Sequence, residues 1–324
     1  RRHKHPVSLQ CRPPDTSDSL SAFHMPPLPM PLSLILSGWS GRLNLMRRWT
    51  RRITKPLAVV ILASIAIVPA ASAVLIAGGD GTGNTTAPSP DPGFDHVGVI
   101  NGLSGVYVRN GWVLTAHHVG ENPILLGGVT YPVIQGSKVR FKNPDLTLAD
   151  LAAFKLAVRP PLTDLLITNN APTLNTNLTM IGNGRNRGAA TTFSGQDGFL
   201  WGAGQALRWG TSRITQINRL SLDTQSLWVT FEDLPPSPSN DNEADVVTGD
   251  SGGAAFTGSG SSAELVGILF ARATLLNQPA NTSIYGNAGI IADLFAYRSE
   301  ILAVIDQPDC DDGLDDDGDG LIDF

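Results

Sequence analysis

Residues 105–120 read "GVYVRNGWVLTAHHVG" and combine a hairpin pattern with two adjacent histidines. Asn110 and Gly111 separate two apolar runs, and Asn-Gly is a pair that tight two-residue hairpin turns prefer. We therefore expect two paired strands, the second of which ends just before His117 and His118. A histidine at a strand end is commonly an ordinary polar residue, so a chemical role for either one requires partners elsewhere in the chain.

Short apolar and β-branched runs continue from residue 74 to about residue 306, separated by Gly, Asn and Pro, as in "TYPVI", "KVRF" and "SLWVTF". Many short strands of this kind predict an all-β barrel or sandwich. No long segment with helical periodicity interrupts them. One terminal helix is expected within "IADLFAYRSEILAVI", residues 291–305.

Charge is distributed unevenly along the 324 residues. Residues 1–73 contain ten Lys and Arg and two Asp, whereas residues 74–324 contain 13 Lys and Arg and 27 Asp and Glu. The acidic body would repel phosphates, which argues against nucleic acid as a partner. Its glycine clusters lack a following helix that could hold a phosphate, so no organic cofactor is predicted.

Residues 46–73 have the order of a secretory signal: a basic start, an apolar run over residues 57–68, and small residues at Ala71 and Ala73. The apolar run is shorter than the roughly 20 residues that a membrane span needs. We expect cleavage after Ala73, a secreted or extracytoplasmic location (periplasm or cell surface), and no membrane span in the processed chain. Residues 1–45 are either an over-extended gene start or a disordered leader.

Cysteine usage is sparse, with Cys11 in the leader and Cys310 near the end. The body between them has no cysteine. A domain of this length can bury a core large enough to fold without disulfides.

Two further motifs supply partners for a histidine. "TGDSGGAAF" places Ser251 among glycines. A serine becomes nucleophilic only when a neighbouring base takes its proton, and a sharply bent, glycine-rich loop can present backbone N–H groups to the oxyanion that forms. "ADLAAFKL" places Asp150 at the head of an apolar run, where a buried carboxylate can fix the tautomer of an imidazole.

Three motifs in the order His, Asp, Ser resemble those of the secreted serine endopeptidases of the trypsin and chymotrypsin type: "LTAHHV", "DLAAFKL" and "GDSGG". The resemblance extends over roughly residues 76–303 and includes "LTMIGNG" and "ELVGIL". It implies two six-stranded antiparallel β-barrels with the active site in the cleft between them, within a protease domain at 74–305. It also implies polypeptide substrates and no cofactor for catalysis.

The resemblance assigns a role to each matching residue. The family pattern T-A-x-H selects His118 and leaves His117 in the variable position. It implies that Ser251 attacks the scissile carbonyl, that His118 transfers the proton and that Asp150 orients His118. The N–H groups of Gly249 and Ser251 would form the oxyanion hole.

The substrate-binding residues follow from the same resemblance. Asp245 stands six positions before Ser251, where the family uses an aspartate to select Arg or Lys before the cut, and Gly289 resembles the glycine that leaves room for a long side chain. Arg272 stands near the pocket entrance, and an internal pair with Asp245 could fill or neutralise the pocket. The alternative is that Asp245 is a simple loop carboxylate.

Activation is a further expectation from the family. Its members commonly dock a freed apolar N-terminus onto the aspartate that precedes the serine, here Asp250. Val74 is the candidate N-terminus, or Ile76 after trimming. If Val74 docks, export alone would activate the enzyme. Where the family usually has cysteines, this chain has Val119 and Val247.

Residues 306–324 contain nine Asp. Asp315, Asp317 and Asp319 fit the opening of a calcium loop, but the acid expected at its twelfth position would lie beyond residue 324, so we expect a truncated sequence. The alternative is a solvated acidic end.

A different class of function competes with the enzyme: a catalytically silent trypsin-like protein that serves in binding or surface attachment. All three candidate residues are present, which favours a serine endopeptidase. A periplasmic quality-control protease is disfavoured because no peptide-binding domain follows. The oligomeric state is not indicated.

Overall fold

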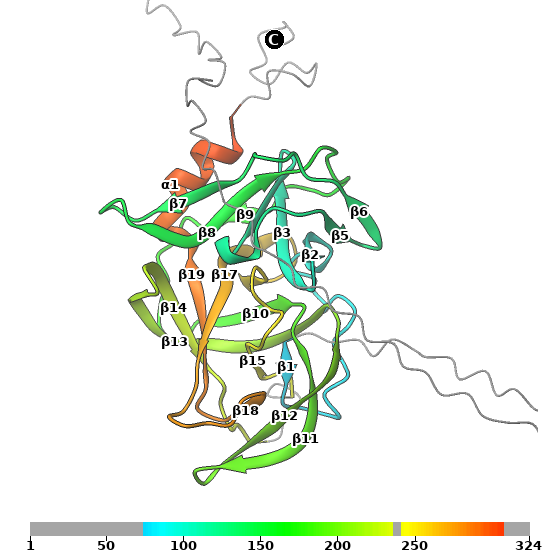
Figure 1. The fold of residues 1–324 in the computed structure, drawn as a ribbon, viewed down its shortest axis with the longest axis vertical. Helices are drawn as coiled ribbons and strands as arrows, with labels where there is room; N and C mark the ends of the chain where they lie inside the picture. Colours follow the sequence, from blue (N-terminus) through cyan, green and yellow to red (C-terminus); the bar gives the residue numbers. More distant parts are fainter. Residues whose placement is uncertain (1–73, 236–240, 308–324) are drawn as a thin grey trace, which may run out of the picture. The chain divides into compact units, whose positions relative to one another are not determined.

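The computed structural model describes residues 74–235 and 241–307 (Figure 1). The predictions for the leader, the signal segment, Cys310 and the calcium ligands Asp315, Asp317 and Asp319 lie outside these residues. In the described part of the chain, no helix is long and apolar enough to cross a membrane.

The first β-sheet is antiparallel and contains the two strands of the hairpin that turns at Asn110 and Gly111. Asn110 and Gly111 have φ angles of 51° and 79°, the left-handed conformation that both central residues of a type I′ turn require, so the predicted hairpin is confirmed. The strand order is β6-β5-β2-β3-β4-β8-β7. Its strands are β2 (Val97–Ile100), β3 (Leu103–Arg109), β4 (Trp112–Thr115), β5 (Ile124–Leu126), β6 (Val129–Tyr131), β7 (Val139–Lys142) and β8 (Leu148–Lys155).

The second sheet closes into a six-stranded antiparallel barrel. Its order is β16-β10-β13-β14-β19-β17, and β17 pairs again with β16. A short parallel strand, β9 (Leu166–Ile167), lies along β17. The barrel strands are β10 (Asn177–Gly182), β13 (Arg208–Ser221), β14 (Thr224–Thr230), β16 (Ala254–Thr257), β17 (Glu264–Ala273) and β19 (Ala288–Asp293).

Smaller elements extend the second barrel. Figure 1 shows the long β11–β12 hairpin below it, with β18 beside β12; near the N-terminal end of the described chain, β1 pairs with β15. These elements are β1 (Leu75–Ile76), β11 (Arg185–Phe193), β12 (Gln196–Gln205), β15 (Ala244–Asp245), β18 (Thr282–Ile284) and the 3-10 turns η1 (Phe94–His96), η2 (His117–Val119) and η3 (Gly260–Ser262).

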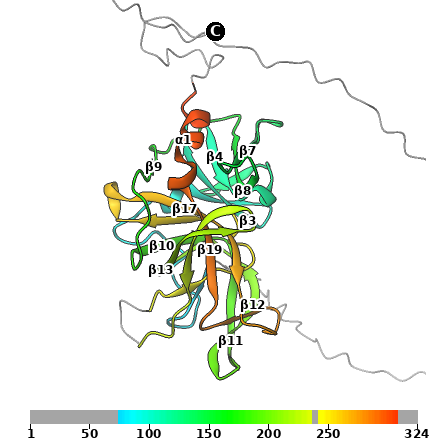
Figure 2. The same ribbon diagram turned by 90° about the vertical axis from the view of Figure 1, so that its left-hand side faces the viewer.

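The predicted terminal helix is present as α1 (Leu294–Ile305). Asp293 caps it by accepting a hydrogen bond from the Phe295 N–H. Figure 2 shows α1 at the end of the molecule that holds the first sheet. The Tyr297 hydroxyl donates to Asn143 at 2.6 Å and accepts from the Gln225 N–H, so the helix links the two sheets.

Apolar packing stabilises the regions where the family usually has cysteines. Val119 is 7% exposed and belongs to the largest apolar cluster. Val247 is 3% exposed and packs with Leu75 and Phe231. Burial of a valine contributes roughly 1.5–3 kcal/mol, which makes the absence of disulfides in the body physically reasonable.

Candidate active site

His118 and Asp150 form a close pair on the first sheet. Strand β4 ends at Thr115 and the η2 turn places His118 next to β8, which carries Asp150. The Asp150 carboxylate accepts two hydrogen bonds from His118, one from Nδ1 to Oδ2 at 2.7 Å and one from the backbone N–H to Oδ1 at 3.0 Å. The Asp150 N–H in turn donates to the Thr224 hydroxyl of the second barrel at 2.8 Å.

Electrostatics fix the protonation of this pair. Burial by itself would raise the pKa of Asp150, but the hydrogen bonds from His118 outweigh burial and hold the pKa below its usual value. The carboxylate is therefore ionised near neutral pH and can only accept, so Nδ1 of His118 carries a proton. In the neutral ring, Nε2 is then free to accept a proton from a nucleophile.

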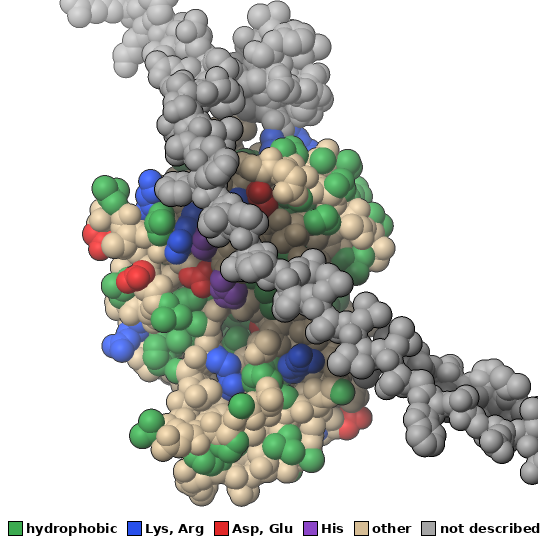
Figure 3. All heavy atoms as spheres, viewed as in Figure 1, with side chains coloured by type: hydrophobic (Ala, Val, Ile, Leu, Met, Phe, Trp, Pro, Cys, Tyr) green, Lys and Arg blue, Asp and Glu red, His purple; other side chains and the backbone are tan. Residues whose placement is uncertain are grey.

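His117 has different surroundings from its neighbour. Its Nδ1 is buried and has no hydrogen-bond partner in the described ranges. Burial, followed by the nearby Arg140 and Lys138, lowers the pKa of His117. Figure 3 shows histidine side chains beside acidic ones on the face that it draws. The carboxylate of Asp150 is hydrogen-bonded to His118.

The serine loop lies directly against the strands that lead to His118. The Ser251 carbonyl accepts from the Ser104 N–H at 2.8 Å, and the Ser104 hydroxyl donates to the Gly249 carbonyl at 3.0 Å. Thr115, three residues before His118, donates its hydroxyl to the Ser104 carbonyl. The Gly252 N–H donates to the Leu269 carbonyl of β17 at 2.7 Å. Both sheets therefore hold the loop that carries Ser251.

Three donors near Ser251 are available for chemistry. Among residues 74–235 and 241–307, the Ser251 hydroxyl makes no hydrogen bond to His118, a contact that often tightens only when substrate is bound. In the same ranges, neither the Gly249 nor the Ser251 N–H donates to another group. Unpaired N–H groups beside a nucleophile are what an oxyanion hole requires.

We expect Gly252→Ala to destabilise the fold. Gly252 has φ +86°, and a Cβ there would lie 1.9 Å from the Ser104 carbonyl oxygen and 2.3 Å from the Thr115 hydroxyl. The clash and the strain together should lower the free energy of unfolding by at least about 2 kcal/mol, measured by urea denaturation. Gly136→Ala is the matched control, because Gly136 has φ +82° with nothing within 4 Å. Equal losses in the two variants would contradict the packing argument.

Asp250 is fully buried behind the serine. Its Oδ2 accepts from the Val247 N–H at 2.7 Å, whereas Oδ1 has no hydrogen-bond partner among the described residues. Burial raises the pKa of Asp250 to about 8. Gly182 and Gly184 leave the room that the carboxyl needs, since a Cβ on either would lie within 2.6 Å of a carboxyl oxygen.

The segment from Val74 is folded into the second barrel. Val74 and Leu75 are 0% exposed, and Leu75 pairs with Asp245 in the short β1–β15 ladder. The Arg187 guanidinium donates to the carbonyls of Ala77 and Gly79 and so holds the following turn. Ile76, the second candidate N-terminus, lies inside the β1 ladder.

A second arginine contacts the same N-terminal segment. Arg208 is fully buried and donates to the Gly81 carbonyl at 2.6 Å. The contacts of Arg187, Arg208 and Thr224 cannot be predicted from the sequence, because an isolated arginine or threonine in a strand carries no motif. The apolar residues on either side of Arg208 in "ALRWG" are the only local sequence signal for its burial.

Asp245 and Arg272 form a buried ion pair. Arg272 Nη2 lies 2.7 Å from Asp245 Oδ2 and also donates to Asn287 Oδ1 at 2.7 Å. Burial raises the pKa of Asp245, although the charge of Arg272 opposes the rise. Gly289 lies opposite Arg272 in the β17–β19 ladder, where a Cβ would lie 2.5 Å from Val246. The pair of Arg272 with Asp245, which the sequence analysis gives as a way to fill the pocket, is therefore present.

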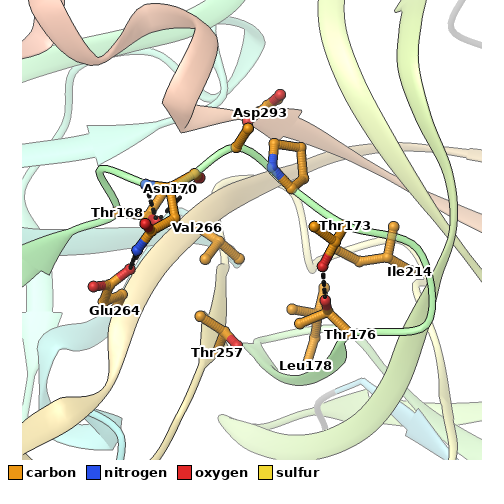
Figure 4. Close-up of a pocket in the computed structure, with 12 residues that line it drawn as sticks. Thr168, Asn170, Thr173, Thr176, Leu178, Ile214, Thr257, Glu264, Val266 and Asp293 are labelled. Atoms are coloured by element: carbon orange, nitrogen blue, oxygen red, sulfur yellow. Dashed lines mark hydrogen bonds between the residues drawn. The ribbon is translucent and has the colours of Figure 1, made fainter.

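A cavity of about 240 Å³ lies elsewhere on the second barrel (Figure 4). At one side of the cavity, the hydroxyls of Thr173 and Thr176 are hydrogen-bonded to each other at 2.7 Å. At the other side, the Thr168 hydroxyl donates to the Glu264 carboxylate at 2.7 Å. Asp293, whose pKa burial raises to about 6, lines it but is engaged in capping α1. None of the residues predicted for catalysis lines this cavity.

The fold and the site define a serine endopeptidase, with two antiparallel β-sheets that bring a His–Asp pair and a glycine-rich serine loop together. The family model described as Trypsin matches residues 86–287, more than half of the chain, so the chain belongs to the trypsin family. Proteases of this type act on polypeptides and need no cofactor for catalysis.

Solved structures of similar fold include mouse neuropsin, described as a serine protease expressed in the limbic system of the brain. It is 18% identical and covers 69% of this chain and 98% of its own, with a TM-score of 0.46. A mutant of human heparin binding protein is 16% identical (70% and 97% covered, TM-score 0.48). Kallikrein-related peptidase 10 is 18% identical (66% and 96% covered, TM-score 0.44). No curated protein sequence matches the chain.

Proposed function

We propose that the protein is an exported serine endopeptidase in which Ser251, His118 and Asp150 form the catalytic triad. The observation that carries the proposal is the two-bond contact of Asp150 with His118 beside a serine loop held by Ser104. Export rests on the signal pattern of residues 46–73.

Each residue has one task in the proposed reaction. His118 Nε2 accepts the Ser251 hydroxyl proton as the oxygen attacks the scissile carbonyl. Asp150 keeps the proton on Nδ1 and stabilises the imidazolium that forms. The Gly249 and Ser251 N–H groups stabilise the oxyanion, and His118 then returns the proton to the leaving amine. Water releases the acyl group by the same steps.

The test is digestion of a diverse peptide mixture by protein that begins at Val74, with every cut site read by mass spectrometry. Cuts that are absent from a parallel digestion with the Ser251→Ala variant would support the proposal of a serine endopeptidase. Absence of any cut would favour the alternative of a catalytically silent binding or surface-attachment protein. The predicted preference for Arg or Lys depends on an accessible Asp245, and the Arg272 ion pair argues against it.

We also propose that Val74 is the activating N-terminus. A buried Asp250 with an unpartnered oxygen requires a cation to be ionised, and the ammonium of a chain cut after Ala73 could supply it. Val74 is favoured over Ile76 because trimming to Ile76 would remove half of the β1 strand.

We expect protein that begins at Val74 to be at least about 100-fold more active than protein that retains residues 71–73, since breaking a buried ion pair costs several kcal/mol. The measurement is kcat/KM on one peptide for both forms. Its control is the Asp250→Asn variant, in which the start residue should no longer matter. Equal activity of the two starts in the unsubstituted chain would contradict the docking of Val74.

A further inference from the structure

We propose that Arg272 is the specificity-determining residue of this enzyme, because it fills the substrate pocket from within. The enzyme then cleaves after small uncharged residues such as alanine, serine and valine and rejects arginine and lysine. The inference rests on the proposed function and names the substrate class for the same site.

The position of Arg272 relative to the nucleophile follows from the backbone contacts of β17. Leu269 accepts from the Gly252 N–H at 2.7 Å and donates to the Gly253 carbonyl at 2.8 Å, directly after Ser251. Arg272 is three residues further along the same strand. The charges of Asp245 and Arg272 both act on the pKa of Asp250, the residue before Ser251. The ion pair therefore lies beside the serine loop.

The guanidinium is fixed by several acceptors rather than by the carboxylate alone. Nη2 donates to Asp245 and Asn287, and Nη1 donates to the Thr282 carbonyl at 3.2 Å. Asn287 is itself oriented by Gln278, to which it donates at 2.6 Å. A preorganised set of acceptors of this kind suits the planar fork of arginine.

An aromatic ring adds to the fixation of Arg272. Its guanidinium carbon lies 5.1 Å from the centre of the Trp201 ring, close enough for a cation–π contact. The Trp201 indole N–H donates to the Ser283 hydroxyl at 3.0 Å, which holds the ring in place. Arg272 is thus held by the strands β12, β15 and β18 in addition to its own.

The low exposure of the Asp245–Arg272 pair leaves a substrate side chain little space and no unpaired carboxylate to bind. The side chain of Asp245 is 0% exposed and that of Arg272 17%. The carboxylate that would bind a basic side chain already has a cation on it, so an incoming arginine or lysine would have to displace Arg272 and meet its like charge. An acidic side chain would have to compete with Asp245 and Asn287 for the Nη2 donors of Arg272, which these two acceptors already occupy. A small uncharged side chain requires neither displacement nor a charge partner.

The test compares cleavage-site profiles of the unsubstituted enzyme, Arg272→Ala and Arg213→Ala on one peptide library. Arg213 is the matched control, because it also belongs to the second barrel and pairs with a carboxylate, Glu232, at 2.6 Å. We expect the unsubstituted enzyme and Arg213→Ala to cut after alanine, serine and valine. Arg272→Ala should raise kcat/KM for arginine relative to alanine by at least about 100-fold.

Two further measurements keep the test decisive if the buried Asp245 destabilises Arg272→Ala. Benzamidinium presents the planar fork that a free carboxylate would bind, and calorimetry should detect its binding to Arg272→Ala at least about 100-fold more tightly than to the unsubstituted enzyme. The double variant Asp245→Ser/Arg272→Ala, which lacks both charges, should accept leucine and phenylalanine but not arginine.

The possible failures are distinguishable. Cleavage after arginine or lysine by the unsubstituted enzyme, or tight benzamidinium binding to it, would overturn the role of Arg272 and leave the endopeptidase proposal standing. Cleavage after glutamate would also overturn the substrate class. Absence of turnover in every variant, together with no labelling of Ser251 by a fluorophosphonate, would overturn the proposed function and this inference with it.

Discussion

Replacing Ser251 by alanine should lower kcat by about 10⁶ and leave the melting temperature unchanged. The loss is expected because the hydroxyl is the nucleophile and no other group of the loop can form the acyl intermediate. Stability should persist because the contacts of Ser251 with the described residues are made by its backbone carbonyl to Ser104, which alanine retains. Single-turnover hydrolysis of a peptide and thermal unfolding measure the two quantities.

Two controls separate the nucleophile from neighbouring groups. Ser262→Ala removes a serine hydroxyl from the exposed η3 turn of the same barrel and should retain full activity. His117→Ala should also remain active, because its ring makes no contact with Asp150 like that of His118. Undiminished hydrolysis by purified Ser251→Ala would end the proposed mechanism.

The local part of the fold could be predicted from sequence because short-range patterns determine it. Asn110 and Gly111 adopt the left-handed turn that their residue types favour, and the helix begins next to the cap Asp293. The histidine and serine motifs likewise identify loops whose shape depends on residues within the motif, such as Gly252, whose φ of +86° favours glycine.

Contacts between residues that are far apart in the sequence are harder to predict. The Asp150 N–H donates to Thr224, 74 residues away, and Arg187 binds carbonyls of the segment more than 100 residues earlier. No local pattern encodes such pairs, because they depend on how the two sheets pack. The pair of Asp245 with Arg272 could be given as an alternative from the family position of each residue, but whether the two side chains meet depends on how β15 and β17 pack in the fold.

Asp150→Asn should lower kcat by about four orders of magnitude while leaving the fold intact, and the geometry explains why an isosteric change is so costly. The carboxylate accepts both from Nδ1 and from the backbone N–H of His118. An amide has only one oxygen. If it accepts from the backbone N–H, its NH₂ faces Nδ1, which must then accept and leave the ring proton on Nε2. That tautomer cannot take the proton of Ser251.

The reverse orientation of the amide would leave its NH₂ against the His118 backbone N–H, an unfavourable contact of two donors, so the unproductive tautomer should dominate. The measurement is kcat for the unsubstituted enzyme and Asp150→Asn, with Asp145→Asn as control. Asp145 is an exposed aspartate whose Oδ1 accepts two hydrogen bonds from Thr147 near β8, and its replacement should leave kcat within about twofold. A kcat for Asp150→Asn within tenfold of the unsubstituted value would show that Asp150 does not set the tautomer of His118.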